Sequence, residues 1–314
     1  MKIAFLADPL SNFKINKDTT YAMMAEAARR GHEIYALQHH DLACRDGKVT
    51  GRAARITMTG DASDWFRADA PQVQALTAFD VVLERTDPPF DMEYVYATYL
   101  LEMAEQQGAR ILNRPQAIRD HNEKLAILQF PQFVSPTLVS RDGDTLRAFQ
   151  QEHGDIILKP LDGMGGAGVF RVKADGMNLG SIIEMLTDNG TRSIMAQRFI
   201  PDITQGDKRV LVIGGEVVPY CLARIPQGNE VRGNLAAGGL GKAQEISAHD
   251  RKIGEALGPV LMQRGLLLVG LDVIGDCLTE VNVTSPTCFQ EIEQQTGFKV
   301  AAMFMDAVEK AIRP

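Results

Sequence analysis

The chain has 314 residues, of which 45% are hydrophobic and 23% are charged, so it is long enough for two domains with a substantial core. The formal net charge of -7 argues against a surface that coats nucleic acid or binds an anionic membrane. Four cysteines form neither a C-x-x-C pair nor a zinc spacing, and no apolar run reaches the length of a signal peptide or a membrane span. A soluble cytoplasmic protein is expected.

The first third of the chain alternates short apolar strands with amphipathic helices. Strands are expected at 3–7, 32–38, 81–85 and 110–113, and helices at 17–30 and 92–107. This alternation predicts an α/β fold with a doubly wound parallel sheet, which binds ligands outside the carboxyl ends of its strands. Asp8, Arg85 and Asn113 fall there. Arg85 either binds a substrate carboxylate or pairs structurally with Asp87 or Glu84.

From about Asp120 onward the strands lengthen and hairpin signals replace the alternation. We therefore expect a Rossmann-like N-terminal substrate domain at 1–120 and a second, α+β domain at 121–314. A weaker boundary near Pro201 divides the second domain into a central subdomain at 121–200 and a C-terminal subdomain at 201–314.

A glycine-rich loop at 162–168 follows a strand at 155–160 that ends in Lys159 and Pro160. The loop is not a dinucleotide-binding turn, because another strand, 169–172, follows it instead of a helix, and it lacks the Gly-Lys-Ser/Thr of a phosphate-binding loop. A tight turn is one interpretation. A hairpin flap whose backbone N–H groups fold over a triphosphate is favoured, because a strand-borne lysine precedes it.

Two arginines flank a predicted hairpin at 207–218 that turns at Gly214 and Gly215: Arg209 near its start and Arg224 at the end of its second strand. They either decorate an edge strand or clamp carboxylate or phosphoryl oxygens. The glycine-rich segment 225–242 has no periodicity and is expected to be a functional loop. Helices are expected at 247–264, 287–295 with Ser285 as its N-cap, and 299–312.

Acidic and amide side chains share one face of a predicted hairpin at 266–286. Glu280 and Asn282 are two residues apart on its second strand, and a three-residue turn at 275–277 places Asp272 opposite Glu280. Oxygen ligands without His or Cys favour Mg²⁺ or Mn²⁺ bridged to substrate phosphates. The alternative is a solvated strand face with scattered acids.

Several long strings of the chain resemble bacterial glutathione synthetase, a family of ATP-grasp enzymes. The strings are Asp-Pro-Pro-Phe at 87–90, Asn-Glu-Lys-Leu at 122–125, the segment 157–166, the segment 219–228, the segment 232–239 and Glu-Val-Asn-Val-Thr-Ser-Pro-Thr at 280–287. They are far more specific than the glycine and carboxylate patterns, which all ATP-grasp enzymes share. The segment 240–242 departs from the family in being less polar than expected.

The resemblance implies a role for each matching residue. ATP would be bound by Lys124, Lys159, Gly163, Gly165, Gly166, Gln197, Phe199, Ile200 and Asp207. Two Mg²⁺ ions would be held by Asp272, Glu280 and Asn282. The peptide substrate would contact Arg85, Arg209, Arg224, Asn282, Ser285 and Thr287, with Arg209 and Arg224 as the catalytic pair. The loop 228–241, with Arg232, Gly238 and Gly239, would close as a lid.

The reaction implied is ATP-dependent ligation of γ-glutamylcysteine and glycine through an acyl phosphate, giving glutathione, ADP and phosphate. The resemblance also implies a homotetramer, without nucleic-acid or membrane partners. A related carboxylate–amine ligase with other substrates remains an alternative, as does a non-catalytic ATP-binding module. Cys221 and Cys288 are interpreted as packing residues.

Overall fold

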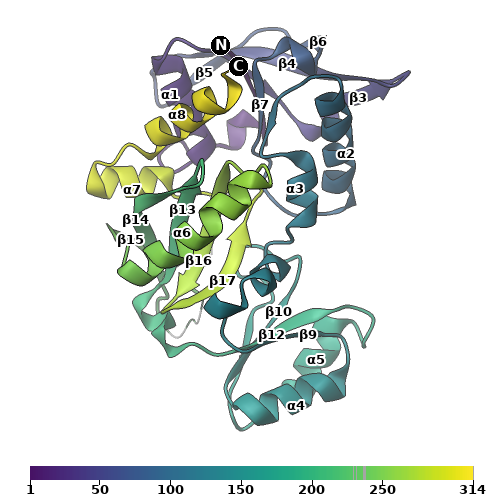
Figure 1. Ribbon diagram of the computed structural model, residues 1–314, viewed down its shortest axis with the longest axis vertical. Coiled ribbons are helices and arrows are strands. Elements are labelled where there is room, and N and C mark those ends of the chain that lie inside the picture. Colours follow the sequence, from purple (N-terminus) through teal and green to yellow (C-terminus); the bar gives the residue numbers. More distant parts are fainter. Residues whose placement is uncertain (229, 231, 236–237, 314) are drawn as a thin grey trace.

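The computed structural model describes residues 1–228, 230, 232–235 and 238–313. Three sheets lie one below another along its longest axis (Figure 1). The upper sheet is built from the first part of the chain, the lowest from the next part, and the middle sheet from the last part. The last helix returns to the upper sheet, so both termini lie at the same end of the molecule.

The upper sheet has the strand order β3-β4-β2-β1-β7-β8, with β5 and β6 also pairing with β4. Its parallel strands, β1 (Lys2–Leu6), β2 (Glu33–Leu37), β7 (Val81–Glu84) and β8 (Ile111–Leu112), confirm the predicted doubly wound part. The antiparallel strands are β3 (Leu42–Arg45), β4 (Lys48–Met58), β5 (Phe66–Ala68) and β6 (Gln72–Ala75). These four strands were not expected, because many of their residues are polar and exposed.

Helices cover both faces of the parallel strands. Ile3 and Phe5 of β1 pack with α1 (Thr19–Arg29) and α8 (Val300–Ile312), whereas Ala4 and Leu6 pack with α2 (Met92–Gln106). Alternate residues of a strand point to opposite faces, so a continuous apolar run fills two cores. α3 (Pro115–Asp120) follows β8.

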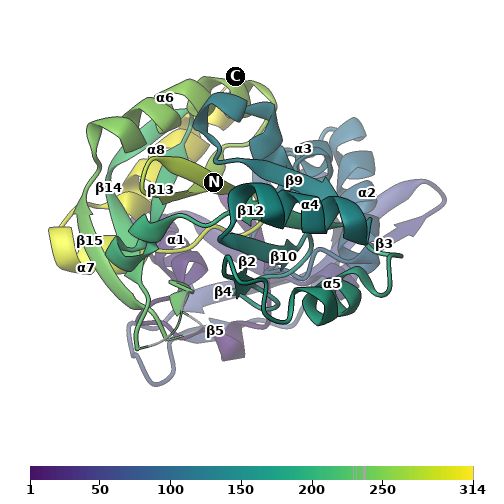
Figure 2. The same cartoon turned by 90° about the horizontal axis from the view of Figure 1, so that it is seen from below.

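The lowest sheet has the order β11-β10-β12-β9 and is entirely antiparallel. Its strands are β9 (Thr137–Ser140), β10 (Ile156–Pro160), β11 (Phe170–Val172) and β12 (Ile194–Arg198). α4 (Gly143–His153) and α5 (Leu179–Thr187) pack on one face, seen in front of the sheet in Figure 2. The other face of this sheet points toward the middle of the molecule.

The middle sheet has the order β15-β14-β13-β16-β17. Its strands are β13 (Asp207–Ile213), β14 (Glu216–Ile225), β15 (Leu240–Glu245), β16 (Leu268–Ile274) and β17 (Cys277–Asn282), and its helices are α6 (Ala248–Gln263) and α7 (Phe289–Thr296). Short 3-10 turns complete the described chain at Leu10–Asn12, His39–Asp41, Leu76–Ala78, Leu125–Gln129, Pro131–Phe133 and Pro201–Gln205.

Three local expectations were wrong. The β16–β17 turn has two residues, Gly275 and Asp276, and Thr279 forms a bulge that restores the expected pairing of Asp272 with Glu280. Ser285 does not cap α7, whose N-cap is Cys288 at φ 88°. β15 begins at Leu240, inside the segment 225–242 that was expected to be a loop.

Asn113 joins the upper and middle sheets instead of facing a ligand. Its Nδ2 donates to the carbonyls of Leu268 and Val283 at 2.8 Å, and its Oδ1 accepts from the Leu268 N–H at 3.0 Å. These buried amide bonds fix β16 and β17 relative to the upper sheet.

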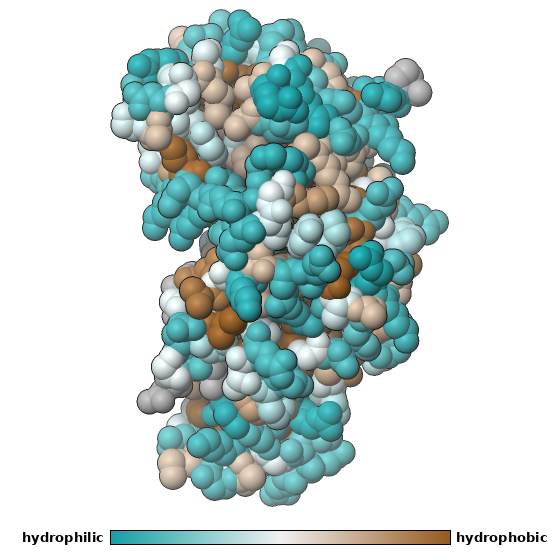
Figure 3. Space-filling view, turned by 90° about the vertical axis from the view of Figure 1, so that its left-hand side faces the viewer, coloured by the Kyte–Doolittle hydropathy of each residue, from teal (hydrophilic) through white to brown (hydrophobic). Residues whose placement is uncertain are grey.

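The face shown in Figure 3 is mostly hydrophilic and narrows at mid-height. Among the described residues, no helix has both the length and the apolar character needed to cross a membrane.

Candidate active site

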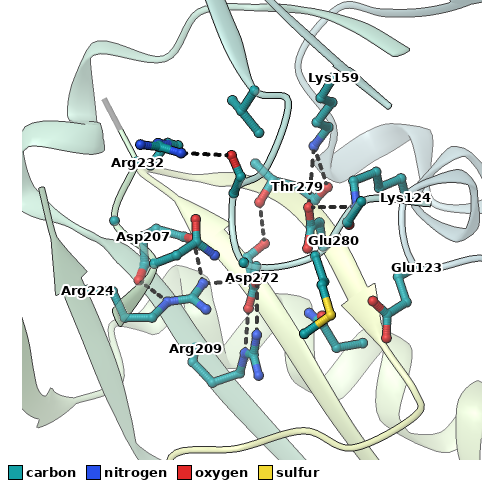
Figure 4. A pocket seen from close by; sticks show the side chains of 18 of the residues that line it. Glu123, Lys124, Lys159, Asp207, Arg209, Arg224, Arg232, Asp272, Thr279 and Glu280 are labelled. Carbon is teal, nitrogen blue, oxygen red and sulfur yellow. Dashed lines mark hydrogen bonds and ion pairs between the residues drawn. The ribbon is translucent and has the colours of Figure 1, made fainter. Parts of the chain in front are cut away.

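A cavity of about 330 Å³ lies between the middle and lowest sheets. Strands of both sheets line it: Lys159 comes from β10, Arg209 from β13, Asp272 from β16 and Glu280 from β17 (Figure 4). The lining includes every residue predicted to bind ATP or metal, and all those predicted to bind the peptide except Arg85. Residues far apart in the chain are therefore brought to one site.

Four buried side chains at one end of the cavity form what we call the Arg–Asp cluster: Asp207, Arg209, Arg224 and Asp272. Arg209 binds Asp272 through Nε at 2.5 Å and Nη2 at 3.2 Å. Arg224 Nη2 lies 2.5 Å from Asp207 Oδ2 and 2.9 Å from Asp272 Oδ2. Two cations thus share two carboxylates, and Asp272 holds both guanidinium groups in place.

Burial and charge act against each other in this cluster. Burial favours a raised pKa for Asp272, but Arg209 and Arg224 outweigh it and hold the pKa well below its usual range. For Asp207, the effect of burial exceeds that of the Arg224 charge, so the pKa is raised. Asp207 Oδ1 is buried without a hydrogen-bond partner among the described residues. A buried acceptor of this kind is suited to a donor from a ligand, as expected for a ribose hydroxyl.

At the other end, Lys124, Lys159 and Glu280 form the Lys–Glu cluster. Glu280 Oε1 lies 3.5 Å from Lys124 Nζ and 3.8 Å from Lys159 Nζ. Lys159 Nζ also donates to the Thr279 carbonyl at 3.3 Å, and burial lowers the pKa of its ammonium group. These are long contacts, so two buried cations share one carboxylate without close pairing. The cluster can therefore accept a further anion such as a phosphate.

The glycine-rich loop lies over this end. Lys124 Nζ donates to the Gly163 carbonyl at 2.6 Å, and Arg232 Nη1 donates to the Gly166 carbonyl at 3.3 Å. A Cβ on Gly166 would lie 2.7 Å from Asn234 Oδ1. The flap and the predicted lid thus touch. Arg232 lines the cavity whereas Gly238 and Gly239 do not, and residues 229, 231, 236 and 237 of the predicted lid lie outside the described residues.

Gln197, Phe199 and Ile200 line the cavity where β12 leaves the lowest sheet. The Arg171 guanidinium lies 3.6 Å from the centroid of the Phe199 ring and is held by Asp155 at 2.5 Å and 3.0 Å. This stack fixes one wall at a position suited to a flat base.

The predicted metal ligands provide oxygen donors from adjacent strands. Asp272 on β16 lies opposite Glu280 on β17 in the strand register. Asn282 Nδ2 donates to the Gly270 carbonyl at 3.1 Å, which leaves the Asn282 Oδ1 atom for another ligand. Among the described residues no three His, Cys, Asp or Glu side chains lie close enough to hold a metal, so the set depends on the Asn282 amide. Carboxylate and amide oxygens fit a hard divalent cation.

Arg85 lies outside the cavity lining, so its predicted contact with substrate is not supported. It does not form the alternative ion pair with Asp87 or Glu84 either, among the described residues. Its Nε donates to Thr20 Oγ1 at 3.2 Å and its Nη2 to the Pro286 carbonyl at 3.0 Å. Arg85 therefore supports the segment that carries Ser285 and Thr287.

Several lining residues were given no role in the sequence-based prediction. Ser285 Oγ donates to Asp87 Oδ1, so Asp87 from the loop after β7 reaches the cavity. Glu123 lines it too, with a pKa raised by burial and by the charge of Glu280. Cys221 and Cys288 are both buried in the hydrophobic core as expected, and Cys288 also lies in the cavity lining. Glu123 had a signal, since it precedes Lys124 in one of the family strings, but no local pattern assigns it a function.

Family models match almost the whole chain. The model of the prokaryotic glutathione synthetase N-terminal domain matches residues 1–119, and that of the prokaryotic glutathione synthetase ATP-grasp domain matches residues 123–297. The chain belongs to the prokaryotic glutathione synthetase family. Membership makes it an ATP-grasp ligase and implies the use of ATP, a divalent metal and small-molecule substrates.

Named relatives align with nearly the full length of this chain. It is 64% identical over 311 residues to glutathione synthetase of Ralstonia nicotianae, covering 99% of this chain and 96% of the relative. It is 58% identical to that of Neisseria meningitidis serogroup B, covering 98% of both. Among solved structures, D-cycloserine synthetase DcsG superposes with a TM-score of 0.70 at 14% identity over 99% of this chain and 100% of that one. The structural likeness supports the fold alone.

Proposed function

We propose that the chain joins the cysteinyl carboxylate of γ-glutamylcysteine to the amine of glycine, with conversion of ATP to ADP and phosphate. The observation that carries this proposal is the cavity in which the paired strands β16 and β17 bring the Lys–Glu cluster next to the Arg–Asp cluster. The first cluster suits phosphate groups and the second suits a carboxylate. The family to which the chain belongs makes glutathione the expected product.

The carboxylate of the dipeptide attacks the γ-phosphorus of ATP, giving an acyl phosphate and ADP. Lys124 and Lys159 bind phosphate oxygens, the flap at Gly163, Gly165 and Gly166 covers them, and Asp207 accepts from the ribose. Arg209 and Arg224 orient the substrate carboxylate and stabilise the negative charge that develops during both transfers. The lid residue Arg232 helps to exclude water, which would otherwise hydrolyse the acyl phosphate.

Asp272, Glu280 and Asn282 would hold Mg²⁺, with Mn²⁺ as a substitute. A divalent cation at this site supplies neutralisation of phosphate charge. Asn282, Ser285 and Thr287 would contact the peptide, and Gln197, Phe199 and Ile200 would line the adenine. We further propose that the protein is a cytoplasmic homotetramer. In each chain, residues 1–120 would form the N-terminal domain, and residues 121–200 and 201–314 would form the two subdomains of the ATP-grasp domain.

The test is ADP release by the purified chain with Mg²⁺, ATP, γ-glutamylcysteine and glycine, omitting one component at a time. We expect turnover only in the complete mixture, with glutathione as the product. Turnover only with another acid or amine would support the ligase activity but exclude γ-glutamylcysteine or glycine as its substrate. ATP binding without turnover in any mixture would indicate a binding module. Replacing Mg²⁺ by Mn²⁺ or Ca²⁺ tests the metal, and light scattering tests the tetramer.

A further inference from the structure

The carboxylate of Glu123 lines the cavity without an ion pair in the described chain. Glu123 Oε1 accepts from Thr284 Oγ1 at 3.1 Å and from the Val283 N–H at 3.4 Å. Oε2 has no hydrogen-bond partner among the described residues, and it is not among the atoms sealed from solvent. One oxygen therefore fixes the side chain and the other is left for a ligand.

The remaining acids of the lining are engaged. Asp207 and Asp272 are bound by arginines, Glu280 lies between two lysines, and Asp87 accepts from Ser285. Of the three lining acids outside the Arg–Asp cluster, Asp87 and Glu123 have no cation within ion-pair distance in the described chain, and Glu123 is the one of these two that lies beside Lys124 and Glu280. A half-buried carboxylate without a cationic partner is stabilised when a positively charged group of a ligand binds to it.

Its place on the chain indicates which end of the substrates it meets. The Val281 N–H donates to the Glu123 backbone carbonyl at 2.8 Å, and Lys124 is the next residue. Glu123 thus lies beside β17, on the same side of the cavity as Lys124 and Glu280 (Figure 4). This is the phosphate end. In the proposed reaction the incoming amine must approach the acyl phosphate here, whereas the glutamyl ammonium group lies at the far end of the dipeptide.

We propose that Glu123 is the catalytic residue that binds the ammonium group of the incoming glycine and accepts its proton. The inference rests on the proposed function. Oε2 takes one proton, which frees the nitrogen lone pair to attack the acyl carbon. The C–N bond forms, the C–O bond to the phosphoryl group breaks, and the second proton leaves with the phosphate. Glu123 then releases its proton to water.

Glu123→Gln separates the basic function of the side chain from its structural role, because the amide oxygen can still accept from Thr284 and Val283 while the basic carboxylate is lost. The full-length variant is assayed with MgATP and γ-glutamylcysteine in two arms. In one arm glycine is varied and glutathione is measured. In the other arm glycine is replaced by hydroxylamine, which is already neutral near pH 7, and the acyl hydroxamate is measured.

We expect kcat/KM for glycine to fall roughly 100-fold, the size of a typical proton-transfer contribution, while hydroxamate formation stays within about threefold. Equal losses in both arms would place Glu123 in phosphate transfer and overturn the proposal. Unchanged rates in both arms would overturn it as well. A rise in KM for γ-glutamylcysteine alone would show that the bound ammonium belongs to the dipeptide, which also contradicts it.

Thr284→Val is the matched control, because it removes a hydrogen bond to Glu123 but leaves the carboxylate. The expected result is a smaller loss in the glycine arm alone, because the carboxylate that accepts the proton is still present but is held by one hydrogen bond fewer. If Thr284→Val reproduced the full loss of Glu123→Gln, the effect would come from the contact between residue 123 and Thr284 and not from the basic oxygen, which would contradict the proposal. Glutathione formation by the unchanged protein is measured first, so that a failure of the proposed function is seen separately.

Discussion

The two charged clusters of the cavity hold their side chains in different ways. In the Arg–Asp cluster the ion-pair distances are 2.5 to 2.9 Å, and each charge has a close partner within the cluster. In the Lys–Glu cluster the distances are 3.5 and 3.8 Å. Close pairing fixes guanidinium groups for a substrate carboxylate, whereas loose pairing leaves ammonium groups available to phosphates. Charge in the first cluster therefore contributes to folding, and in the second it serves mainly the ligand.

Breaking the close pairs has the largest expected effect. Asp272→Asn removes the carboxylate that binds both Arg209 and Arg224 and leaves two buried cations with one partner. We expect a loss of about 3–5 kcal/mol in the free energy of unfolding, as for a broken buried ion pair. Activity should fall more than about 100-fold, because the arginines lose their positions. Denaturant unfolding and glutathione formation measure the two effects.

Asp207→Asn is the matched comparison, since it leaves Asp272 bound to both arginines. Because burial already raises the pKa of Asp207, its charge contributes less and the loss in stability should be smaller. An Asp272→Asn protein that unfolds at the same denaturant concentration as the unchanged protein would show that the cluster does not support the fold.

The loose cluster should separate activity from stability. Lys159→Met removes a buried ammonium group whose pKa is lowered by burial and whose carboxylate partner is 3.8 Å away. We expect the KM for ATP to rise more than about tenfold, equivalent to roughly 1.4 kcal/mol of binding. The free energy of unfolding should stay the same or increase, because the methionine side chain needs no polar partner.

Lys208→Met provides the opposite case on β13, outside the cavity. Lys208 Nζ lies 2.5 Å from the fully buried Asp250, so its loss leaves that carboxylate unpaired. We expect lower stability with ATP binding unchanged. If Lys159→Met destabilised the protein as much as Lys208→Met does, the distinction between close and loose pairing would not hold.

A smaller effect is expected where the flap meets the lid. Gly166→Ala places a Cβ 2.7 Å from Asn234 Oδ1 and 3.0 Å from Arg232 Cδ, at φ +82°. The contact must shift, and we expect kcat/KM to fall roughly tenfold. Gly31→Ala is the control, because Gly31 has φ +77° and a Cβ added there would have no described atom within 4 Å apart from its chain neighbours. Both should lose about 1 kcal/mol of stability, but equal activities would contradict a role for the contact.

Local patterns predicted the strands that carry the site better than the contacts between them. The β13–β14 hairpin that turns at Gly214-Gly215 places Arg224 opposite Asp207, two residues from Arg209. The pairing of Asp272 with Glu280 was correct, although the bulge at Thr279 was not foreseen. Such features follow from residues near one another in the chain. The positions of Arg85 and Asn113 depend on partners such as Pro286 and Leu268, more than 150 residues away, and no local periodicity encodes these.

The pH dependence of stability distinguishes the two ends of the cavity by its sign. The pKa of Asp272 is below its unfolded value of 3.8, so its contribution is present above that pH and is lost as the pH falls through the folded value. The pKa of Glu123 is raised from 4.5, so its contribution is full below pH 4.5 and is lost as the pH rises through the folded value.

Urea unfolding of three proteins between pH 4 and 8 measures this difference. Relative to the unchanged protein, Glu123→Gln should gain stability as the pH rises, by about 1.4 kcal/mol for each unit by which the pKa is raised. Asp272 remains ionised in the folded protein over the same range, so the pH dependence of the stability lost in Asp272→Asn should come from Asp207, whose raised pKa depends in part on the Asp272 charge. Parallel curves for Glu123→Gln and the unchanged protein would mean that Glu123 titrates as it does in the unfolded chain. Its carboxylate would then be well solvated in the absence of substrate, and the cavity would have to exclude water only after the ligands bind.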